Sequence, residues 1–216
     1  DQRVGPGGER EHDLDTVGML EVDGDRTAAA VPFRERARWI GRHGRHVGGE
    51  TLEQFLDALN VEPADLVGND SGGGIAQIFS ALYPQRVRSL TLTDCDVHDN
   101  WPPAAFKPFL AMAAGGGLRG TLEAMLSNKD MYRSPQALGP AYEHPEHVTD
   151  ESIETYLRPL VRTEQRTRDL QRFLAAFDNA HTRAIEARLK TLSVPTLIVW
   201  GTDDVYFDVE WSKWLA

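Results

Sequence analysis

The segment at residues 66–77, Leu-Val-Gly-Asn-Asp-Ser-Gly-Gly-Gly-Ile-Ala-Gln, constrains the fold of this chain more than any other. A mainly apolar run at 64–67 leads into a glycine-rich turn, and a segment with helical spacing follows. Small residues two before and two after a central residue allow the sharp strand–turn–helix bend of a nucleophile elbow. Gly68 and Gly72 hold those positions and therefore place Asp70 where the nucleophile stands.

Helical and extended patterns alternate around this turn. Apolar residues recur at helical spacing in 50–59, and residues 66–67 are predicted to close a short buried strand. The segments 87–93 and 194–200 are predicted to be further strands, the first of them covered on both faces. Helix, strand, helix and strand in this order predict an α/β fold with a parallel sheet and crossover helices.

The alternation of helix and strand stops between residues 97 and 190, where amphipathic helices follow one another without a strand. We expect helices at 104–113, 118–126, 150–161, 164–177 and 182–189. We interpret 97–190 as a helical cap inserted into an α/β core formed by 49–96 and 191–216.

The first 48 residues do not fit this plan. They are rich in Arg, Gly, Asp and His and have no sustained apolar period, apart from a candidate hairpin at 18–31 and a basic stretch at 34–45. We hypothesise that residues 1–48 are not a native hydrolase N-terminus but a truncation scar or a shifted reading frame. The chain also stops inside a run that looks helical, so we expect a fragment of a longer protein.

Composition excludes several classes of partner. The chain is 41% hydrophobic and 26% charged, as globular proteins are, and its formal net charge of −10 argues against nucleic acid and anionic membranes. No apolar run reaches the length of a membrane span. The single cysteine, Cys95, excludes an internal disulfide, fits the cytoplasm and is expected to be buried and structural. The sequence leaves the oligomeric state open.

With the elbow, the cap and the strand end Trp200-Gly-Thr-Asp-Asp in this order, residues 49–216 resemble the α/β-hydrolase superfamily. The aspartate at the elbow is similar to that of the haloalkane dehalogenase, haloacetate dehalogenase and epoxide hydrolase branches. The resemblance implies a mostly parallel α/β-hydrolase sheet with an inserted cap, here without the N- and C-terminal parts of the core. It also implies a hydrolase without cofactor or metal that acts on a small apolar organic molecule.

The residue type at position 70 sets the chemistry. A helix N-terminus favours an ionised carboxylate, which needs no base to displace a leaving group from an alkyl carbon and form an enzyme ester. A histidine then activates water, and a second acid orients that histidine. The backbone N–H of Ser71 lies where one oxyanion donor is needed.

By resemblance, the orienting acid maps onto Asp204, and Asp203 is one residue short of the usual turn. Asp94, at the end of the preceding strand, matches an alternative acid position. Trp101 opens the cap and is expected to line the substrate pocket. Three cap tyrosines are available to polarise an epoxide oxygen: Tyr132, Tyr142 and Tyr156.

Three departures from the family pattern matter. The catalytic histidine is expected beyond residue 216, because the histidines present read as surface residues: His12, His43, His46, His98, His144, His147 and His181. The early His-Gly motif that supplies the other oxyanion donor is absent, and Ser71 stands where many relatives carry tryptophan. We therefore expect these 216 residues alone to be inactive.

Two rival readings stay open. Ser71 could be the nucleophile of a serine-type esterase, which would put Asn69 where a small residue belongs. The chain could also derive from a ligand-binding protein that keeps the elbow and pocket but has lost the histidine. A full-length sequence that carries a histidine after residue 216 would favour the enzyme.

Overall fold

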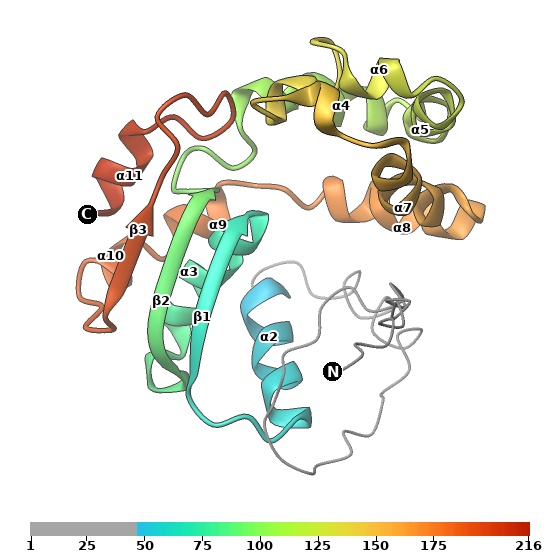
Figure 1. The fold of residues 1–216 in the computed structure, drawn as a ribbon. Helices are drawn as coiled ribbons and strands as arrows, with labels where there is room; N and C mark the ends of the chain where they lie inside the picture. Colours follow the sequence, from blue (N-terminus) through green and yellow to red (C-terminus); the bar gives the residue numbers. More distant parts are fainter. Residues whose placement is uncertain (1–46) are drawn as a thin grey trace, which may run out of the picture. The chain divides into compact units, whose positions relative to one another are not determined.

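The computed structural model describes residues 47–216, and their order confirms the predicted α/β arrangement. Strands β1 (Ala64–Asp70), β2 (Val87–Cys95) and β3 (Thr196–Val199) form one sheet in that order, and both pairings are parallel. Helix α3 (Ser71–Leu82) connects β1 to β2 and packs on both, and α2 (Val47–Ala58) packs on α3 (Figure 1). Parallel neighbours require such crossovers, so the sheet places the ends of β1, β2 and β3 at one edge.

The face of the sheet that packs on α3 forms a hydrophobic core. Phe79 of α3 and Leu90 and Leu92 of β2 are at most 1% exposed, and they pack with Leu56 of α2. Cys95 belongs to the same cluster, which confirms its predicted burial. Burial, followed by nearby aspartate charges, raises the pKa of the Cys95 thiol to about 12. A thiol that stays protonated at neutral pH is structural rather than reactive.

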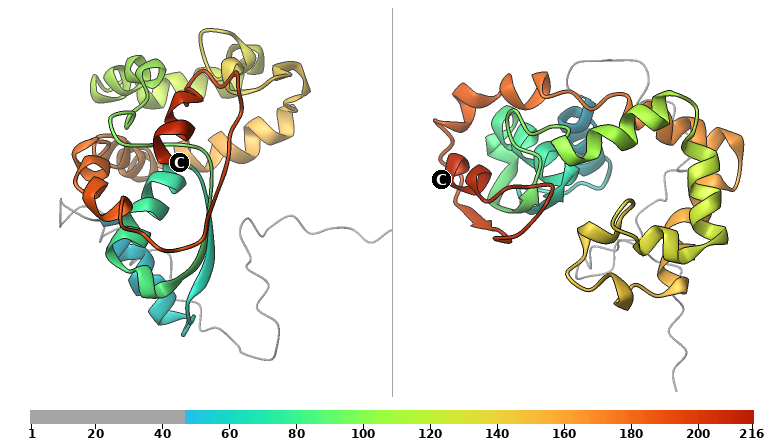
Figure 2. Two further views of the ribbon diagram at one scale, coloured as in Figure 1. Left: turned by 90° about the vertical axis from the view of Figure 1, so that its left-hand side faces the viewer. Right: turned by 90° about the horizontal axis from the view of Figure 1, so that it is seen from above.

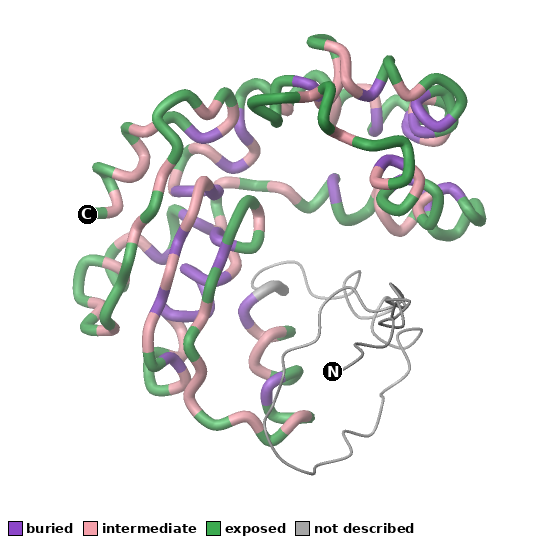
Figure 3. Tube along the Cα trace, viewed as in Figure 1, coloured by how far each residue is buried: buried purple, intermediate pink, exposed green. Residues whose placement is uncertain are grey.

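The prediction of a buried strand at residues 66–67 is wrong for Val67, which lies on the opposite face of the sheet. Val67 is 75% exposed, because successive strand residues point to opposite faces and only Leu66 turns toward the α3 side. Val67 pairs with Thr91, and Thr91 pairs with Leu197, so these three share a face. Leu197 is 57% exposed, so the described helices leave this face open; Figure 3 shows the alternation along the strands.

Residues 107–174 form helices that pack around a cluster of their own (Figure 2), whereas residues 180–189 pack on α3. The cluster includes Leu118, Leu122, Ile153, Leu157 and Leu174. The helices are α4 (Lys107–Ala114), α5 (Leu118–Ser127), α6 (Lys129–Arg133), α7 (Asp150–Val161), α8 (Glu164–Leu174), α9 (Ala180–Arg183) and α10 (Glu186–Leu189).

These helices follow the predicted pattern with several differences, among them that α4 begins at Lys107 rather than at 104 and that α8 ends at Leu174 rather than at 177. The helix expected at 150–161 has the predicted bounds, and the one at 118–126 extends by one residue. The segment expected at 182–189 divides into α9 and α10, and α6 was not predicted. Helix α11 (Glu210–Leu215) confirms the helical pattern near the chain end. The boundaries of the cap as a separate domain remain a prediction.

Several expectations concern residues outside the described part. The candidate hairpin at 18–31, the basic stretch at 34–45 and three histidines (His12, His43 and His46) all precede residue 47. Within the described residues, no helix combines the length and apolar character that crossing a membrane requires.

Thr149 is expected to stabilise the start of α7 by capping it. Its hydroxyl oxygen accepts the backbone N–H of Ser152 at 3.1 Å. Thr149→Ala should lower the free energy of unfolding by about 1 kcal/mol, because that N–H loses its partner. Thr155→Ala, on the exposed side of α7, is the matched control and should cost nothing, since alanine has the higher helix propensity. Equal losses in urea unfolding would contradict the capping role.

Candidate active site

The turn between β1 and α3 has the geometry of a nucleophile elbow at residue 70. Strand β1 ends at Asp70 and α3 begins at Ser71, with no loop between them. Asp70 has φ 52° and ψ −135°, a backbone conformation that non-glycine residues rarely adopt. Such strain marks functional turns, because the rest of the structure must hold it in place. The side chain of Asp70 is exposed at the end of the sheet.

The Asp70 carboxylate is held by the backbone that follows it. Its Oδ1 accepts the N–H of Ser71 at 2.7 Å, and the Ser71 hydroxyl lies 3.3 Å from the same oxygen. The hydrogen bond fixes Oδ1 at the N-terminus of α3. Oδ2 accepts no bond from Ser71, so one carboxylate oxygen is held and the other is left for chemistry.

The glycines of the turn differ in what they permit. A β-carbon at Gly68 would lie 2.7 Å from the α-carbon of Gly73, so the turn tolerates no side chain there. A β-carbon at Gly72 would meet nothing within 4 Å. Gly72 marked the elbow in the sequence, yet close packing depends on Gly68 and Gly73 instead.

The two acids predicted from the later strands both contact the loop after β3. Asp94, with φ 30° at the end of β2, accepts the N–H of Gly201 at 2.7 Å. Asp204 accepts the N–H groups of Tyr206 and Phe207 at 2.7 and 2.9 Å. Both carboxylates therefore hold the loop after β3, while Asp203 is exposed.

Tyr206 links Asp204 to the elbow. Burial raises the pKa of its phenol, and the charges of Asp204 and Asp70 raise it further. One phenol therefore lies within electrostatic reach of both carboxylates. The fold thus brings Asp70 and Asp204 to the same end of the sheet, as expected for residues that follow parallel strands.

A further acid, Asp96, was missed by the sequence reasoning. It is fully buried just after β2, and its backbone N–H donates to the carbonyl of Asp70 at 3.2 Å. Burial, and then the charge of Asp70, raise its pKa to about 7. The Ser71 hydroxyl faces Asp96 and partly offsets that rise, although no hydrogen bond of standard geometry joins them. The one available signal was an Asp-Cys-Asp run, and periodicity does not say which aspartate turns inward.

Asp96 lies in a polar region beneath α3. Gln77 donates to the carbonyl oxygens of Asp96 and Gly73 at 2.8 and 3.1 Å. Within the described residues, both Asp96 carboxylate oxygens, Gln77 Oε1, Ser80 Oγ and Trp101 Nε1 are buried without a hydrogen-bond partner. Buried polar atoms normally have hydrogen-bond partners, so hydrophobic packing alone does not account for this polar region.

Trp101 and the cap tyrosines are placed mainly by packing. Trp101 is 7% exposed and packs with Ile78 and Ile185, so little of it can meet a substrate in this conformation. The hydroxyls of Tyr132 and Tyr142 hydrogen-bond to each other at 2.9 Å, whereas Tyr156 is 61% exposed.

The four described histidines make their contacts away from Asp70. His98 was expected at the surface, but its side chain is only 15% exposed and lies 3.3 Å from both Asp99 and Glu186. The ring of His181 lies 6.0 Å from that of Trp101, and the rings of His144 and His147 lie 4.9 Å apart and are tilted by 36°. Between residues 47 and 216, no group of three His, Cys, Asp or Glu side chains could hold a metal ion.

A parallel sheet with an acid at a strand–turn–helix elbow and further acids after the next strands defines a hydrolase-type α/β architecture. The sequence model of the protein family described as alpha/beta hydrolase fold matches residues 49–214, so the chain belongs to this family.

Individual relatives are hydrolases of small organic acids by name. The chain is 60% identical over 51 residues to 2-hydroxymuconate semialdehyde hydrolase of a Pseudomonas species, covering 24% of this chain and 18% of that protein. It is 25% identical over 175 residues to a 2-hydroxy-6-oxononadienedioate/2-hydroxy-6-oxononatrienedioate hydrolase of Paraburkholderia phymatum, covering 76% and 54%. The chain therefore spans about half the length of this curated relative.

A solved structure agrees in fold. The 2-hydroxy-6-oxo-6-phenylhexa-2,4-dienoate hydrolase from Rhodococcus sp. strain RHA1 has a TM-score of 0.54 at 17% identity, over 80% of this chain and 60% of that chain. None of these three relatives is named a dehalogenase or an epoxide hydrolase. That finer expectation rests on Asp70 alone.

Proposed function

We propose that this chain is part of a hydrolase that acts on a small organic molecule through a covalent ester on Asp70. The observation that carries the proposal is the backbone of Asp70, with φ 52° at the junction of β1 and α3. Strain of this kind persists where a side chain must be presented at a fixed point. The names of the relatives support the coarser class, hydrolysis of small organic molecules.

The geometry divides the work between the two carboxylate oxygens of Asp70. Oδ2 attacks an electrophilic carbon, the bond to the leaving atom breaks, and an alkyl ester forms. Oδ1 becomes the ester carbonyl and keeps the N–H of Ser71 at the 2.7 Å already present. Water then attacks the ester carbon, and negative charge develops on Oδ1, where the donor is already in place. The alcohol product leaves and the carboxylate is restored.

Asp96 and Asp204 take different parts in this proposal. Asp96 keeps its proton up to about pH 7 because its carboxyl is buried. A buried carboxyl that keeps its proton suits the role of acid, and an exposed acid at the elbow suits that of nucleophile. The Ser71 hydroxyl stands where Asp-nucleophile enzymes carry tryptophan, and Asp96 lies behind it as the acid. Asp204 orients the base that activates water, with Asp94 as the alternative acid.

A serine-type hydrolase is the second candidate, because Ser71 has acid neighbours of its own. Its hydroxyl lies 3.3 Å from Asp70 Oδ1 and faces Asp96, so a proton acceptor is close on either side. In that mechanism an acyl group would be carried by Ser71 and Asp70 would act as the base.

Covalent trapping separates the two candidates. We expect a 1-bromoalkane or a terminal epoxide to add its alkyl mass to Asp70, as located by peptide mass spectrometry. Asp70→Ala should abolish the adduct and Ser71→Ala should retain it. A fluorophosphonate, which phosphonylates reactive serines, should leave Ser71 unmodified. A phosphonyl group on Ser71 would contradict the aspartate mechanism, and its loss in Asp70→Asn would identify Asp70 as the base that activates Ser71.

A further inference from the structure

Two segments connect helices α4–α8 to the sheet, and they contact each other. Residues 98–101 follow β2, and residues 179–186 lead back through α9 and α10 toward β3 (Figure 1). The hydroxyl of Thr182 donates to the carbonyl oxygen of His98 at 2.6 Å, and Thr182 is 1% exposed. Trp101 packs with Ile185 in one buried cluster. Contacts between the two segments therefore hold both ends of the helical region against each other.

His98 is placed between two carboxylates in this contact. Its Nδ1 lies 3.3 Å from Asp99 Oδ2, and its Nε2 lies 3.3 Å from Glu186 Oε2 on α10. The ring also packs on the indole of Trp214 in α11, with 4.6 Å between the ring centroids. The backbone of His98 has φ 44°, a strained conformation that persists where surrounding contacts hold it. The loop after β2, α10 and α11 thus meet at this side chain.

The two carboxylate contacts distinguish the charged from the neutral form of the His98 ring. A neutral imidazole donates from one nitrogen only, and its other nitrogen presents a lone pair. An ionised carboxylate only accepts, so in the neutral form one lone pair would face a negative oxygen. The imidazolium donates from both nitrogens and can satisfy both carboxylates. The contact between the segments is therefore stronger when His98 carries its proton.

The charged groups on the elements packed against His98 form three ion pairs: Asp99–Arg183 at 3.2 Å, Glu186–Lys190 at 2.6 Å and Glu210–Lys213 at 2.5 Å. Lys190, and then His98, lower the pKa of Glu186, so this carboxylate stays ionised in weakly acidic solution. Of these residue types, only histidine ordinarily gains or loses its proton between about pH 5.5 and 8. A change of pH in this range therefore acts on this contact through His98.

We propose that His98, Asp99 and Glu186 form a pH-sensitive latch between the two segments, closed when the imidazole is protonated. At weakly acidic pH the imidazolium ties the end of β2 to α10. As pH rises, the proton passes to solvent and one of the two carboxylate contacts loses its donor. The segments then separate more often, and α4–α8 become freer to move relative to the sheet. This device is independent of the chemistry proposed for Asp70.

Hydrogen–deuterium exchange of the 216-residue chain tests the latch between about pH 5.5 and 8, after correction for the intrinsic pH dependence of exchange. We expect the corrected exchange rate of amides in residues 179–189 to rise about threefold or more across this range, the size of effect that a small network of partly exposed ion pairs can have. Amides of residues 87–92 in β2 should keep their corrected rates. A corrected rate in 179–189 that does not rise overturns the proposal.

Variants assign the change to the latch. His98→Gln cannot be charged, so the pH dependence in residues 179–189 should disappear. Glu186→Gln should reduce it by about half or more, because a neutral amide no longer favours the imidazolium. His181→Gln is the matched control, because His181 lies in the same segment, with its ring 6.0 Å from that of Trp101, and its replacement should leave the pH dependence unchanged.

Protection of the β2 amides shows that each variant is folded, and Glu186→Gln alone decides if His98→Gln does not fold. An unchanged pH dependence in a folded latch variant overturns the proposal. Its loss in His181→Gln does the same, because a different histidine would then be responsible.

Discussion

Replacing Asp96 by asparagine should make the protein progressively more stable than the wild type as the pH rises from 4 to 8. The pKa of Asp96 is raised from its ordinary 3.8 to about 7, chiefly because the carboxyl is buried. Between those values the unfolded chain has lost the proton while the native state retains it. The wild type therefore loses stability as pH rises through this window, by about 1.4 kcal/mol for each unit of pKa shift.

The full effect is about 4 kcal/mol, obtained from the shift of roughly three units. Below pH 4 both states are protonated and the difference between variant and wild type is constant; above about pH 7 it is constant again. Asparagine has nearly the same shape and no charge, so its own contribution does not change across this range. The change with pH, rather than the stability at any single pH, measures the buried carboxyl.

Urea unfolding of the wild type and Asp96→Asn at half-unit steps of pH provides the measurement. Asp203→Asn is the matched control, because Asp203 is exposed and its replacement should leave the pH dependence of the wild type unchanged. A difference between Asp96→Asn and wild type that stays flat from pH 4 to 8 would mean that Asp96 is ionised in the native protein. The division of roles between Asp70 and Asp96 would then fail.

Sequence patterns correctly predicted the features that depend on residues close together in the chain. The apolar spacing of residues 150–161 gave the bounds of α7, and the glycines around Asp70 gave the turn that Asp70 occupies with φ 52°. Both depend on residues a few positions apart. The elbow could therefore be recognised without knowing what packs on it.

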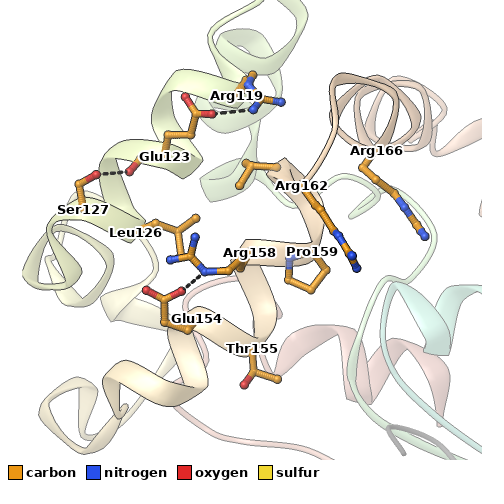
Figure 4. A pocket seen from close by; sticks show the side chains of 11 residues that line it. Arg119, Glu123, Leu126, Ser127, Glu154, Thr155, Arg158, Pro159, Arg162 and Arg166 are labelled. Carbon is orange, nitrogen blue, oxygen red and sulfur yellow. Dashed lines mark hydrogen bonds and ion pairs between the residues drawn. The ribbon is translucent and has the colours of Figure 1, made fainter. Parts of the chain in front are cut away.

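The remaining features depend on elements that are distant in the sequence. Val67 was predicted to be buried, but its exposure depends on what covers the second face of the sheet. Asp96 turns inward because α3 lies against the end of β2, and an isolated Asp-Cys-Asp run does not reveal this. The groove lined by residues of α5, α7 and α8 (Figure 4) combines residues that are distant in the chain, so no single stretch of sequence contains it.

Gly73→Ala should destabilise the protein by about 3 kcal/mol or more, the range expected for an overpacked core. A β-carbon at Gly73 would lie 2.2 Å from the β-carbon of Cys95 and 2.5 Å from its sulfur. Cys95 is fully buried and belongs to β2, so neither side of this contact can move without separating α3 from the sheet. Gly72→Ala is the matched control, because a β-carbon there meets nothing within 4 Å. Its effect on stability should be within about 0.5 kcal/mol.

A double-mutant cycle assigns the loss to this one contact. Cys95→Gly removes both atoms that the new methyl group would strike, at the cost of a cavity in the core. Combined with Gly73→Ala, it should therefore cost at least about 2 kcal/mol less than the two single losses added together. Additive losses in urea unfolding would place the strain elsewhere. Because Asp70 pairs with Cys95 across β1 and β2, the contact that admits only glycine at position 73 also fixes where the elbow presents its carboxylate.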